Sequence, residues 1–481
     1  MPLTPLDRRR FLMSSALAGV GVAGLSGCGT MGLPPFAGGL DADVEELQER
    51  TFRWFLDVTN DKGLTPDRWP SESFASIAAC GFALTCWPVG VERGWISREQ
   101  AREITLKTVR FFHDAPQGPA ARGMTGHKGF FYHFIDMETG HRFERTELST
   151  VDTSLLVAGM LFAAQWFDQD DADEAEIRAK VQAIYERIEW DWVMARPNRI
   201  SMGWHPETGF IPADWHIYNE GMIVLHLAMG SPTHPVPAAV WDEWCSVYDQ
   251  SWTDRWGPLH LHFAPMFGHQ YSHMFVDYRG IHDGWLRGVQ SQVPGFDYFQ
   301  NSVRAVQAQR KYAIDNTNGW AGYSADVWGL TACDGPGDFK QVIDGRERQF
   351  FSYSARGPGD RDDGTIAPTA AMASMPFAPR DVTACLKAMK ARYGAGIYTR
   401  YGFLDSFNPT LTHRDGRLMH GTIIDGVGWV DGDYLGIAQG PIVIQIENHR
   451  TDAVWKQMRG EPNLIRGLKR AGFTGGWLDR A

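Results

Sequence analysis

Helical periodicity that recurs along nearly the whole chain constrains the fold more than any other feature of this sequence. Segments with apolar residues at helical spacing alternate with loops rich in Gly, Pro and Asp, and we find no linker between residues 43 and 481. Ser97 and Gln100 form a capping box that opens one of these helices. The pattern predicts helices over residues 43–60, 97–114, 150–167, 173–194, 219–229, 236–252, 298–312, 380–393, 440–459 and 461–471, and one more after Ser71.

Two insertions between these helices have the alternation of β-hairpins. The first covers residues 129–134 and turns at 138–140, and the second covers residues 200–204 and turns at 207–209. Close to a dozen helices joined by long loops favour an all-α fold, with an (α/α)6 toroid of helix hairpins around a loop-lined cleft as the simplest architecture. We therefore expect one domain over residues 43–481, with small β-hairpin insertions in its loops.

The N-terminus has the features of an export signal. Arg8-Arg9-Arg10-Phe11-Leu12 matches a twin-arginine motif, and the apolar run that ends at Leu25 is too short for a membrane-spanning helix. Leu25-Ser26-Gly27-Cys28 resembles a bacterial lipobox, in which the cysteine is lipidated. We expect residues 1–27 to be removed, Cys28 to carry the lipid, and residues 28–42 to tether a periplasmic protein to the inner or outer membrane.

The charge balance excludes some partners. The chain has 46 Lys and Arg against 57 Asp and Glu, and 43 against 56 remain once the three Arg and one Asp of the signal are removed. An acidic surface repels nucleic acid, so we expect a neutral or cationic partner and membrane contact only through the lipid. The 19 Trp could serve as platforms for sugar rings, although core packing is the commoner role for any one of them.

Cysteine and histidine patterns indicate no bound metal. Five Cys follow Cys28, an odd number without a Cys-x-x-Cys pair, which predicts mostly free and buried thiols. His260 and His262 form a His-x-His pattern, but neither a His-Glu-x-x-His helix nor a thiolate partner accompanies it. We expect no metal and no other cofactor.

Glu220 is the most prominent candidate for acid catalysis. It lies between the aromatic residues Trp215 and Tyr218 and the start of an apolar helix. Burial beside aromatic rings favours a protonated carboxyl, as a proton donor to a sugar oxygen requires. A helix start, with Asn219 as N-cap and Glu220 in the first turn, explains the same residues without catalysis.

Other carboxylates allow similar pairs of interpretations. Asp405 stands in an aromatic, turn-rich loop over residues 401–409, where an Asx-type turn is the alternative. Glu147 and Asp152 surround the start of a helix, where Asp152 could simply stabilise the helix dipole. Glu447 interrupts an apolar helix and needs either substrate or a buried Arg such as Arg279. Hydrolysis of a glycosidic bond requires two carboxyls, and Glu220 with Asp405 is the best pair.

A polar segment over residues 259–283 supplies donors, acceptors and flat rings suited to sugar hydroxyls, although a hydrogen-bonded core loop could have the same composition. We expect substrate contacts from this segment and from aromatic and acidic residues elsewhere. The candidates are Trp215, Tyr218, Tyr271, His273, Asp277, Arg279, Asp283, Trp328 and Glu447.

Ordered motifs between about Thr51 and Trp477 resemble glycoside hydrolase family 144 and the broader glycoamylase-like proteins. They lie at residues 218–220, 230–235, 268–273, 279–283, 328–336, 401–408 and 440–442. The resemblance implies an (α/α)6 fold, hydrolysis of linear or cyclic β-1,2-glucan with inversion, and no cofactor. It also implies that Glu220 is the general acid, that Asp405 is the general base, and that Asp152 and Glu147 are further acids of the cleft.

Other functions share these features. A transglycosylase or an exo-acting β-glucosidase could use the same scaffold. A polysaccharide lyase could use Tyr271 and His273 for proton transfer, but its uronate substrate needs a basic patch that these segments lack. A sugar-binding lipoprotein without catalysis is the alternative from another class.

Overall fold

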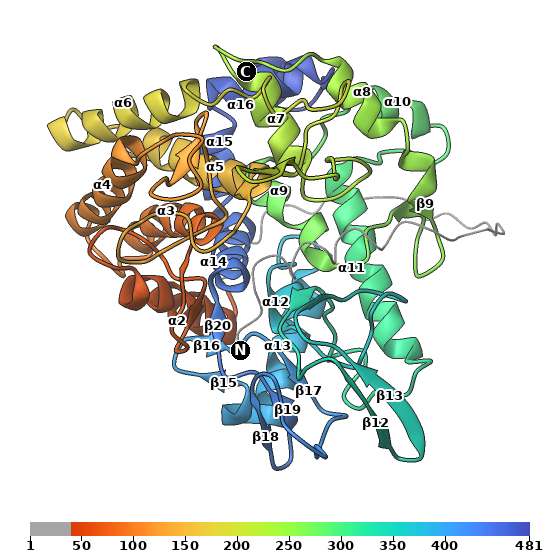
Figure 1. Ribbon diagram of the computed structural model, residues 1–481. Coiled ribbons are helices and arrows are strands. Elements are labelled where there is room, and N and C mark those ends of the chain that lie inside the picture. Colours follow the sequence, from red (N-terminus) through yellow and green to blue (C-terminus); the bar gives the residue numbers. More distant parts are fainter. Residues whose placement is uncertain (1–39) are drawn as a thin grey trace.

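An inner ring of helices, each buried on almost every side, forms the centre of residues 40–481, which the computed structural model describes (Figure 1). These helices are α3 (Ile77–Glu92), α5 (Thr150–Trp166), α7 (Met222–Gly230), α9 (Tyr271–Phe275), α12 (Pro368–Met372) and α14 (Gly436–Thr451). Chain neighbours in the ring pack together from α3 to α9 and from α12 to α14, and α14 closes the ring against α3. The Gln270 side chain connects α9 to α12 by donating to the Ala370 carbonyl at 2.9 Å.

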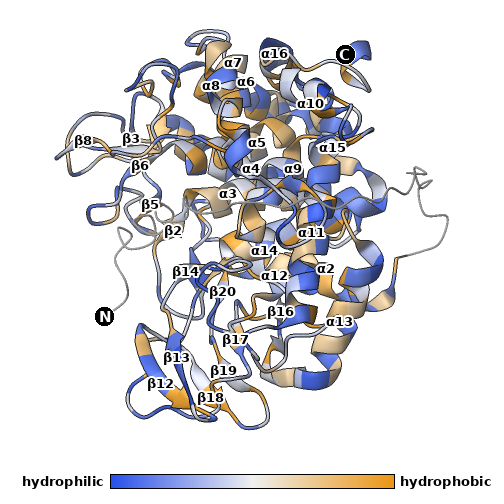
Figure 2. Ribbon diagram, turned by 90° about the vertical axis from the view of Figure 1, so that its right-hand side faces the viewer, coloured by the Kyte–Doolittle hydropathy of each residue, from blue (hydrophilic) through white to orange (hydrophobic). Residues whose placement is uncertain are grey.

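Each inner helix follows an outer helix in the chain. The outer helices are α2 (Ala42–Val58), α4 (Arg98–Asp114), α6 (Ala172–Glu186), α8 (Ala239–Cys245), α11 (Tyr298–Asp315) and α13 (Pro379–Tyr393). An outer helix such as α2 buries its apolar face and exposes its polar face, whereas the inner helices α3, α5 and α7 lack a polar face and must be enclosed (Figure 2). The predicted capping box of Ser97 and Gln100 is present, and the predicted (α/α)6 toroid is confirmed.

Some predicted helices differ in their ends. The segment predicted as one helix over 440–459 is divided into α14 and α15 (Ala453–Met458), because Asp452 adopts a left-handed φ of 60° that interrupts the helical hydrogen bonds. Pro441 lies inside α14 and not at its start. The short helices α9, α10 (Gly284–Val289) and α12 were not predicted, since five or six residues carry too little periodicity; α16 (Pro462–Arg470) follows α15.

Short strands lead into the inner helices at one side of the ring (Figure 2). β2 (Ala75–Ser76), β6 (Leu148–Ser149) and β20 (Tyr434–Leu435) run directly into α3, α5 and α14. β2 pairs with β5 (Phe134–Ile135), and β20 pairs with β1 (Arg68–Trp69). Ser76 and Ser149 end their strands and also cap the helices that follow, so each strand fixes the first turn of an inner helix.

The hairpin predicted over 200–209 is confirmed as β7 (Gly203–His205) and β8 (Gly209–Phe210). The hairpin predicted over 129–140 is confirmed in part, because Ile135 and Arg142 form an antiparallel bridge across the predicted turn at 138–140. Its predicted first strand is divided, since β4 (Phe130–Phe131) pairs with β3 (Gly126–His127) and β5 pairs with β2. A longer hairpin of β12 (Phe339–Ile343) and β13 (Arg346–Phe350) was not predicted. The other strands are β9 (Trp252–Thr253), β10 (His260–Leu261), β11 (Ala332–Cys333), β14 (Ser354–Ala355), β15 (Tyr398–Thr399), β16 (Gly402–Phe403), β17 (Phe407–Asn408), β18 (Thr422–Ile424) and β19 (Gly428–Val430).

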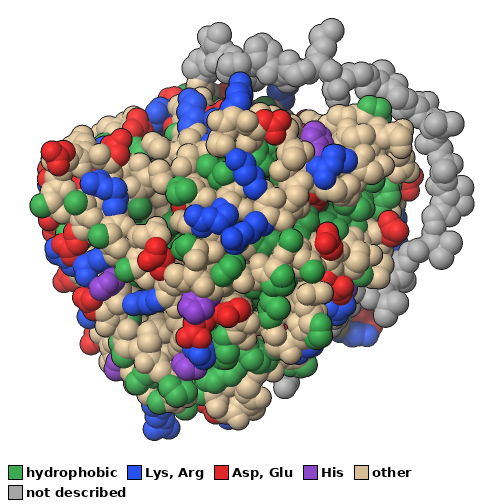
Figure 3. Space-filling model, turned by 90° about the horizontal axis from the view of Figure 1, so that it is seen from above, with side chains coloured by type: hydrophobic (Ala, Val, Ile, Leu, Met, Phe, Trp, Pro, Cys, Tyr) green, Lys and Arg blue, Asp and Glu red, His purple; other side chains and the backbone are tan. Residues whose placement is uncertain are grey.

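The predicted signal over 1–27 and Cys28 lie outside the described residues, as does most of the predicted tether. None of the helices within residues 40–481 has the length and apolar composition needed to cross a membrane. Basic and acidic side chains are interspersed on the face seen from above in Figure 3. The five cysteines in this part of the chain are free, and four of them are buried, as predicted.

Candidate active site

A small pocket opens where the N-terminal ends of the inner helices meet the strands. It encloses about 90 Å³ and receives residues from α3, α5, α9, α14 and the residue before the N-cap of α7. The positive ends of helix dipoles therefore point toward a space that holds carboxylates. The lining residues are Ala78, His133, Val151, Asp152, Leu155, Glu220, Phe267, Tyr271, Ala332, Tyr353, Ala355 and Ile437.

Glu220 lies at the bottom of this pocket, with 5% of its surface exposed. The helix-start interpretation of this residue is wrong, because Gly221 is the N-cap of α7 and Glu220 precedes the helix. The Ser272 hydroxyl holds its backbone by donating to the Glu220 carbonyl at 2.8 Å. A side chain at Gly221 would collide with Trp215, whose ring lies 2.5 Å from the ideal Cβ position. Backbone contacts and close packing thus aim the carboxyl of Glu220 into the pocket.

Asp152 lines the same pocket, one turn into α5. Ser149 caps this helix, and its hydroxyl also donates to the Asp152 carboxylate. His133 lies on the other side, with Nε2 3.4 Å from Asp152 and Nδ1 3.0 Å from Glu147. The two predicted additional acids are therefore connected through a histidine that we did not single out.

Asp405 belongs to a second group of acids, between β16 and β17. Its carboxylate accepts from the Asp334 backbone N–H at 2.9 Å, and carboxylate oxygens of Asp334, Asp405 and Asp431 lie within 4.8 Å of one another. Arg68 donates to Asp334 at 2.6 Å and lies 3.6 Å from Asp433. The Asx-type turn in this loop belongs to Asn408, whose side-chain oxygen accepts from the backbone two residues ahead, so that alternative does not account for Asp405.

The acidic group around Asp405 carries more negative than positive charge. Burial, and then the charges of Asp334, Asp405 and Asp433, raise the pKa of Asp431 well above its ordinary value, although Arg68 opposes them. Asp431 therefore keeps its proton to a higher pH than an exposed aspartate does. Oxygens at this spacing could also suit a divalent cation, but the guanidinium of Arg68 already supplies positive charge to Asp334.

Tyr271 lines the pocket together with Glu220 and Asp152. Its hydroxyl donates to the Ile437 carbonyl at 3.0 Å, which fixes the ring in the pocket wall. Burial raises the pKa of Tyr271 well above its ordinary value, and the charges of Glu220, Asp152 and Asp405 add to this effect. Asp405 itself does not line this pocket.

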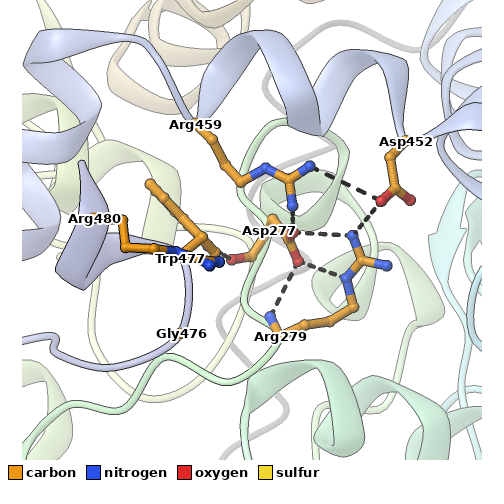
Figure 4. Close-up of a pocket in the computed structure, with 7 residues that line it drawn as sticks. All are labelled: Asp277, Arg279, Asp452, Arg459, Gly476, Trp477 and Arg480. Atoms are coloured by element: carbon orange, nitrogen blue, oxygen red, sulfur yellow. Dashed lines mark hydrogen bonds and ion pairs between the residues drawn. The ribbon is translucent and has the colours of Figure 1, made fainter. Parts of the chain in front are cut away.

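Asp277 and Arg279, predicted as substrate contacts, lie in a different place. They line an open basin near the C-terminus together with Asp452, Arg459, Gly476, Trp477 and Arg480 (Figure 4). Arg279 binds Asp277 through two nitrogens at 2.7 and 2.9 Å, and Arg459 donates to the same carboxylate at 2.7 Å. Their contacts join the loop after α9 to the end of the chain, and they do not line the pocket of Glu220.

The remaining predicted contact residues are enclosed in the protein. Tyr218 packs its ring against His269 and Tyr298, and His273 has 1% of its surface exposed and contacts Ser302. Asp283 caps α10 and accepts from two aromatic side chains. Six of the predicted contact residues have little or no exposed surface and do not line the pocket of Glu220, so their contacts with substrate stay predictions: Trp215, Tyr218, His273, Asp283, Trp328 and Glu447.

Glu447 has partners other than the predicted Arg279. Gln48 donates to its carboxylate at 3.1 Å and Thr451 at 2.7 Å, while Arg93 lies at 3.5 Å. Because α14 packs against α2 and α3, its buried acid meets side chains of those helices. Glu447 therefore joins three helices, and the proposed pair with Arg279 is wrong.

Some pocket residues were missed from the sequence because their partners lie far along the chain. His133 reaches Asp152 through the antiparallel bridge of Tyr132 with Leu148, next to the His133 N–H bond to the Glu147 carbonyl. Tyr353 enters the pocket through the pairing of β11 with β14. Arg68 meets Asp433 through β1 and β20. The closely spaced acids 431 and 433 were a local signal that could have been noticed.

Comparison with known proteins gives one family. Residues 212–462 match the family model named Glycoamylase and described as "Putative glucoamylase". A solved structure with the same description, from Bacteroides uniformis, is 30% identical with a TM-score of 0.76 and covers 90% of this chain and 98% of its own. An endo-β-1,2-glucanase from Chitinophaga pinensis, in complex with sophorotriose and glucose, is 26% identical with a TM-score of 0.74 and covers 92% of this chain and all of its own.

A curated relative from Parabacteroides distasonis is named an exo β-1,2-glucooligosaccharide sophorohydrolase acting at the non-reducing end. It is 26% identical over 461 residues, which cover 89% of this chain. The match spans 57% of the length of that relative.

Proposed function

The chain belongs to the glycoamylase-like family, and from that premise we propose that it is a glycoside hydrolase that cleaves β-1,2-linked glucan with inversion. The observation that carries the proposal is the pocket that Glu220 and Asp152 line, together with the buried acidic group of Asp334, Asp405 and Asp431. Two relatives that match most of the chain, one by structure and one by sequence, are named for action on β-1,2-linked glucose chains.

Glu220 is the proposed general acid. It donates its proton to the oxygen of the scissile bond, directly or through a sugar hydroxyl, as the bond to the anomeric carbon breaks. A buried carboxyl beside another carboxylate holds a proton more tightly than one in water, and the pocket provides both burial and Asp152. The oxygen of the leaving sugar accepts that proton and becomes a hydroxyl.

Asp405 is the proposed general base. It takes a proton from water while the water oxygen bonds to the anomeric carbon from the opposite face. The Asp334 backbone N–H donates to one oxygen of Asp405 and orients the carboxylate. Because the attack inverts the configuration, a β-linkage yields a product with an α-hydroxyl at its new reducing end.

The first experiment measures sugar release from β-1,2-glucan and from a β-1,3-glucan as the comparison substrate. Release from the β-1,2-linked substrate, with the α-anomer detected by NMR, supports the proposal. Release from the β-1,3-linked substrate alone contradicts the assignment of β-1,2-glucan as the substrate. A β-anomer together with products larger than the substrate indicates a transglycosylase. Product sizes distinguish exo from endo action, since sophorose alone indicates exo release.

Variants test the assigned roles. We expect Glu220→Gln and Asp405→Asn each to lower kcat by about 100-fold or more, because each loses its acid or base function. Glu103→Gln, at a side chain that is 68% exposed, and Asp425→Asn, at an exposed loop residue, are matched controls that keep parental activity. Binding without any hydrolysis by the parent would identify a sugar-binding protein instead.

We further propose that the protein is exported by the twin-arginine route and anchored in the periplasm through lipid on Cys28. The motif at Arg8-Arg9-Arg10 and the lipobox that ends at Cys28 support this location. The variant Cys28→Ser should move the protein from the membrane fraction to the soluble periplasmic fraction. Parent protein that is soluble after fractionation would contradict the anchor.

A further inference from the structure

His133 lies between two buried carboxylates at the edge of the catalytic pocket. Its Nδ1 is 3.0 Å from Glu147 Oε1, and its Nε2 is 3.4 Å from Asp152 Oδ1. Glu147 has 3% of its surface exposed and Asp152 has 6%, so solvent does little to screen either charge. Of the three residues, His133 and Asp152 line the pocket and Glu147 lies behind them.

The two ring nitrogens of His133 contact different carboxylates. A neutral imidazole has one N–H and one nitrogen lone pair, so it can donate to one carboxylate but not to two. The contact between Nδ1 and Glu147 has hydrogen-bond geometry, and Nε2 lies at ion-pair distance from Asp152.

The backbone holds His133 in this position. Its N–H donates to the Glu147 carbonyl at 3.0 Å, and its carbonyl accepts from the Ile77 N–H at 3.3 Å. Its ring stacks on Phe134 with centroids 3.8 Å apart. The imidazole is therefore attached both to the segment before α5 and to the first turn of α3.

Asp152 is held from two sides. The Ser149 hydroxyl donates to Oδ2, and His133 lies beside Oδ1. Because Ser149 is also the N-cap of α5, the position of this carboxylate is tied to the helix start. Its carboxylate lines the pocket together with Glu220, Tyr271 and Tyr353.

We propose that His133 is a positioning residue that, supported by Glu147, orients Asp152 to accept a hydrogen bond from a substrate hydroxyl beside Glu220. This inference rests on the proposed function, since it concerns the same pocket and a sugar substrate. It adds a residue and a role to that function. The ligand class is a glucose unit whose hydroxyl donates to Asp152 while Glu220 donates to the glycosidic oxygen.

Substitutions at His133 separate its two nitrogens. His133→Phe keeps the ring stacked on Phe134 and removes both donors, and we expect kcat/KM for β-1,2-glucan to fall by about 10- to 100-fold. His133→Gln places an amide N–H where Nε2 was and should recover most of the loss. His133→Asn places its N–H where Nδ1 was, toward Glu147, and should recover little.

His127→Phe is the matched control. His127 is also an aromatic-packed histidine, next to Trp192 and Trp204, and it does not line the pocket. We expect its kcat/KM to stay within about twofold of the parent. Thermal unfolding of every variant shows whether the fold is kept, so a loss of activity at His133 with an unchanged Tm is assigned to the pocket.

A double-mutant cycle with Asp152→Asn tests whether His133 acts through Asp152. If it does, His133→Phe lowers kcat/KM by less than about threefold in the Asp152→Asn background, because the carboxylate that His133 orients is already gone. The inference is overturned if His133→Phe lowers kcat/KM equally in both backgrounds, or if His133→Asn recovers as much activity as His133→Gln. Either result leaves the proposed function intact. A parent that hydrolyses no β-1,2-glucan overturns the proposed function and the role of His133 with it.

Discussion

Replacing Arg356 by Met provides a quantitative test of how the pocket wall is held. Arg356 is fully buried, and its Nε and Nη2 each donate to Asp363 at 2.8 Å. The same guanidinium donates to the carbonyls of Cys333 at 2.9 Å and of Phe351 and Ser352 at 3.1 Å. One side chain thus connects β11 to the segment before β14 and to the loop of Asp363.

The contacts give the expected loss of stability. Breaking a buried ion pair costs about 3–5 kcal/mol. Asp363 still accepts from the backbone N–H groups of Phe351 and Thr365, so the cost of losing the ion pair lies at the lower end, about 3 kcal/mol. Three carbonyls that lose a charged donor add roughly 0.5 kcal/mol each. We therefore expect Arg356→Met to lower the free energy of unfolding by about 4–5 kcal/mol, a large part of the stability of an ordinary domain.

Urea unfolding followed by tryptophan fluorescence measures this loss. The double variant Arg356→Met/Asp363→Leu should recover part of it, because it leaves no unpaired buried charge. Lys340→Met is the control, since its pair with Glu347 is more than half exposed and should change stability by less than about 1 kcal/mol. A loss below about 1 kcal/mol for Arg356→Met, or a double variant less stable than the single one, would refute the reasoning.

Three further predictions concern packing, pH and the acid. Gly159→Ala places a Cβ 2.0 Å from a carbonyl oxygen of α3 and should lower the free energy of unfolding, measured in urea, by about 1–3 kcal/mol. Gly288→Ala, where the Cβ meets open space, should not lower it. Equal stabilities of the two variants would contradict the close contact of α5 with α3. Burial lowers the pKa of His226 to about 3, so stability falls as the pH drops below about 6.5, where the unfolded chain binds the proton first. His226→Gln should reduce the slope of stability against pH by up to about 1.4 kcal/mol per pH unit. An unchanged slope would exclude His226 as the cause of the pH dependence. Ser272→Ala loses the hydrogen bond to the Glu220 carbonyl and should lower kcat about five- to tenfold, while an unchanged kcat would show that packing alone positions the acid.

Much of the helical framework could be predicted from sequence because its signals are local. The segment 150–167 is apolar all round, and it became the inner helix α5, whereas the stripe over 43–60 became the outer helix α2. Pocket membership was harder to predict. Glu220 and Asp152 were recognised from their neighbours in sequence, but His133 and Tyr353 have no distinctive local context.

Polar composition misled the sequence analysis where it could not report burial. The segment 259–283 has the composition of a sugar site, yet His273 and Asp283 are enclosed, and Asp277 and Arg279 line a different basin. A buried hydrogen-bonded network and a ligand site need the same donors and acceptors. The position of a side chain relative to the pocket distinguishes them, and a sequence does not contain that position.

By itself the sequence determined most of the longer helices and the family, since hydropathy period, caps and ordered motifs are properties of neighbouring residues. Tertiary structure alone decided which acids share a pocket. Glu220 and Asp152 line one pocket although they come from different hairpins of the ring, and the antiparallel bridge of Tyr132 with Leu148 brings His133 to Asp152. Contacts across such separations depend on how the whole ring closes, because no local segment records the position of its distant partners.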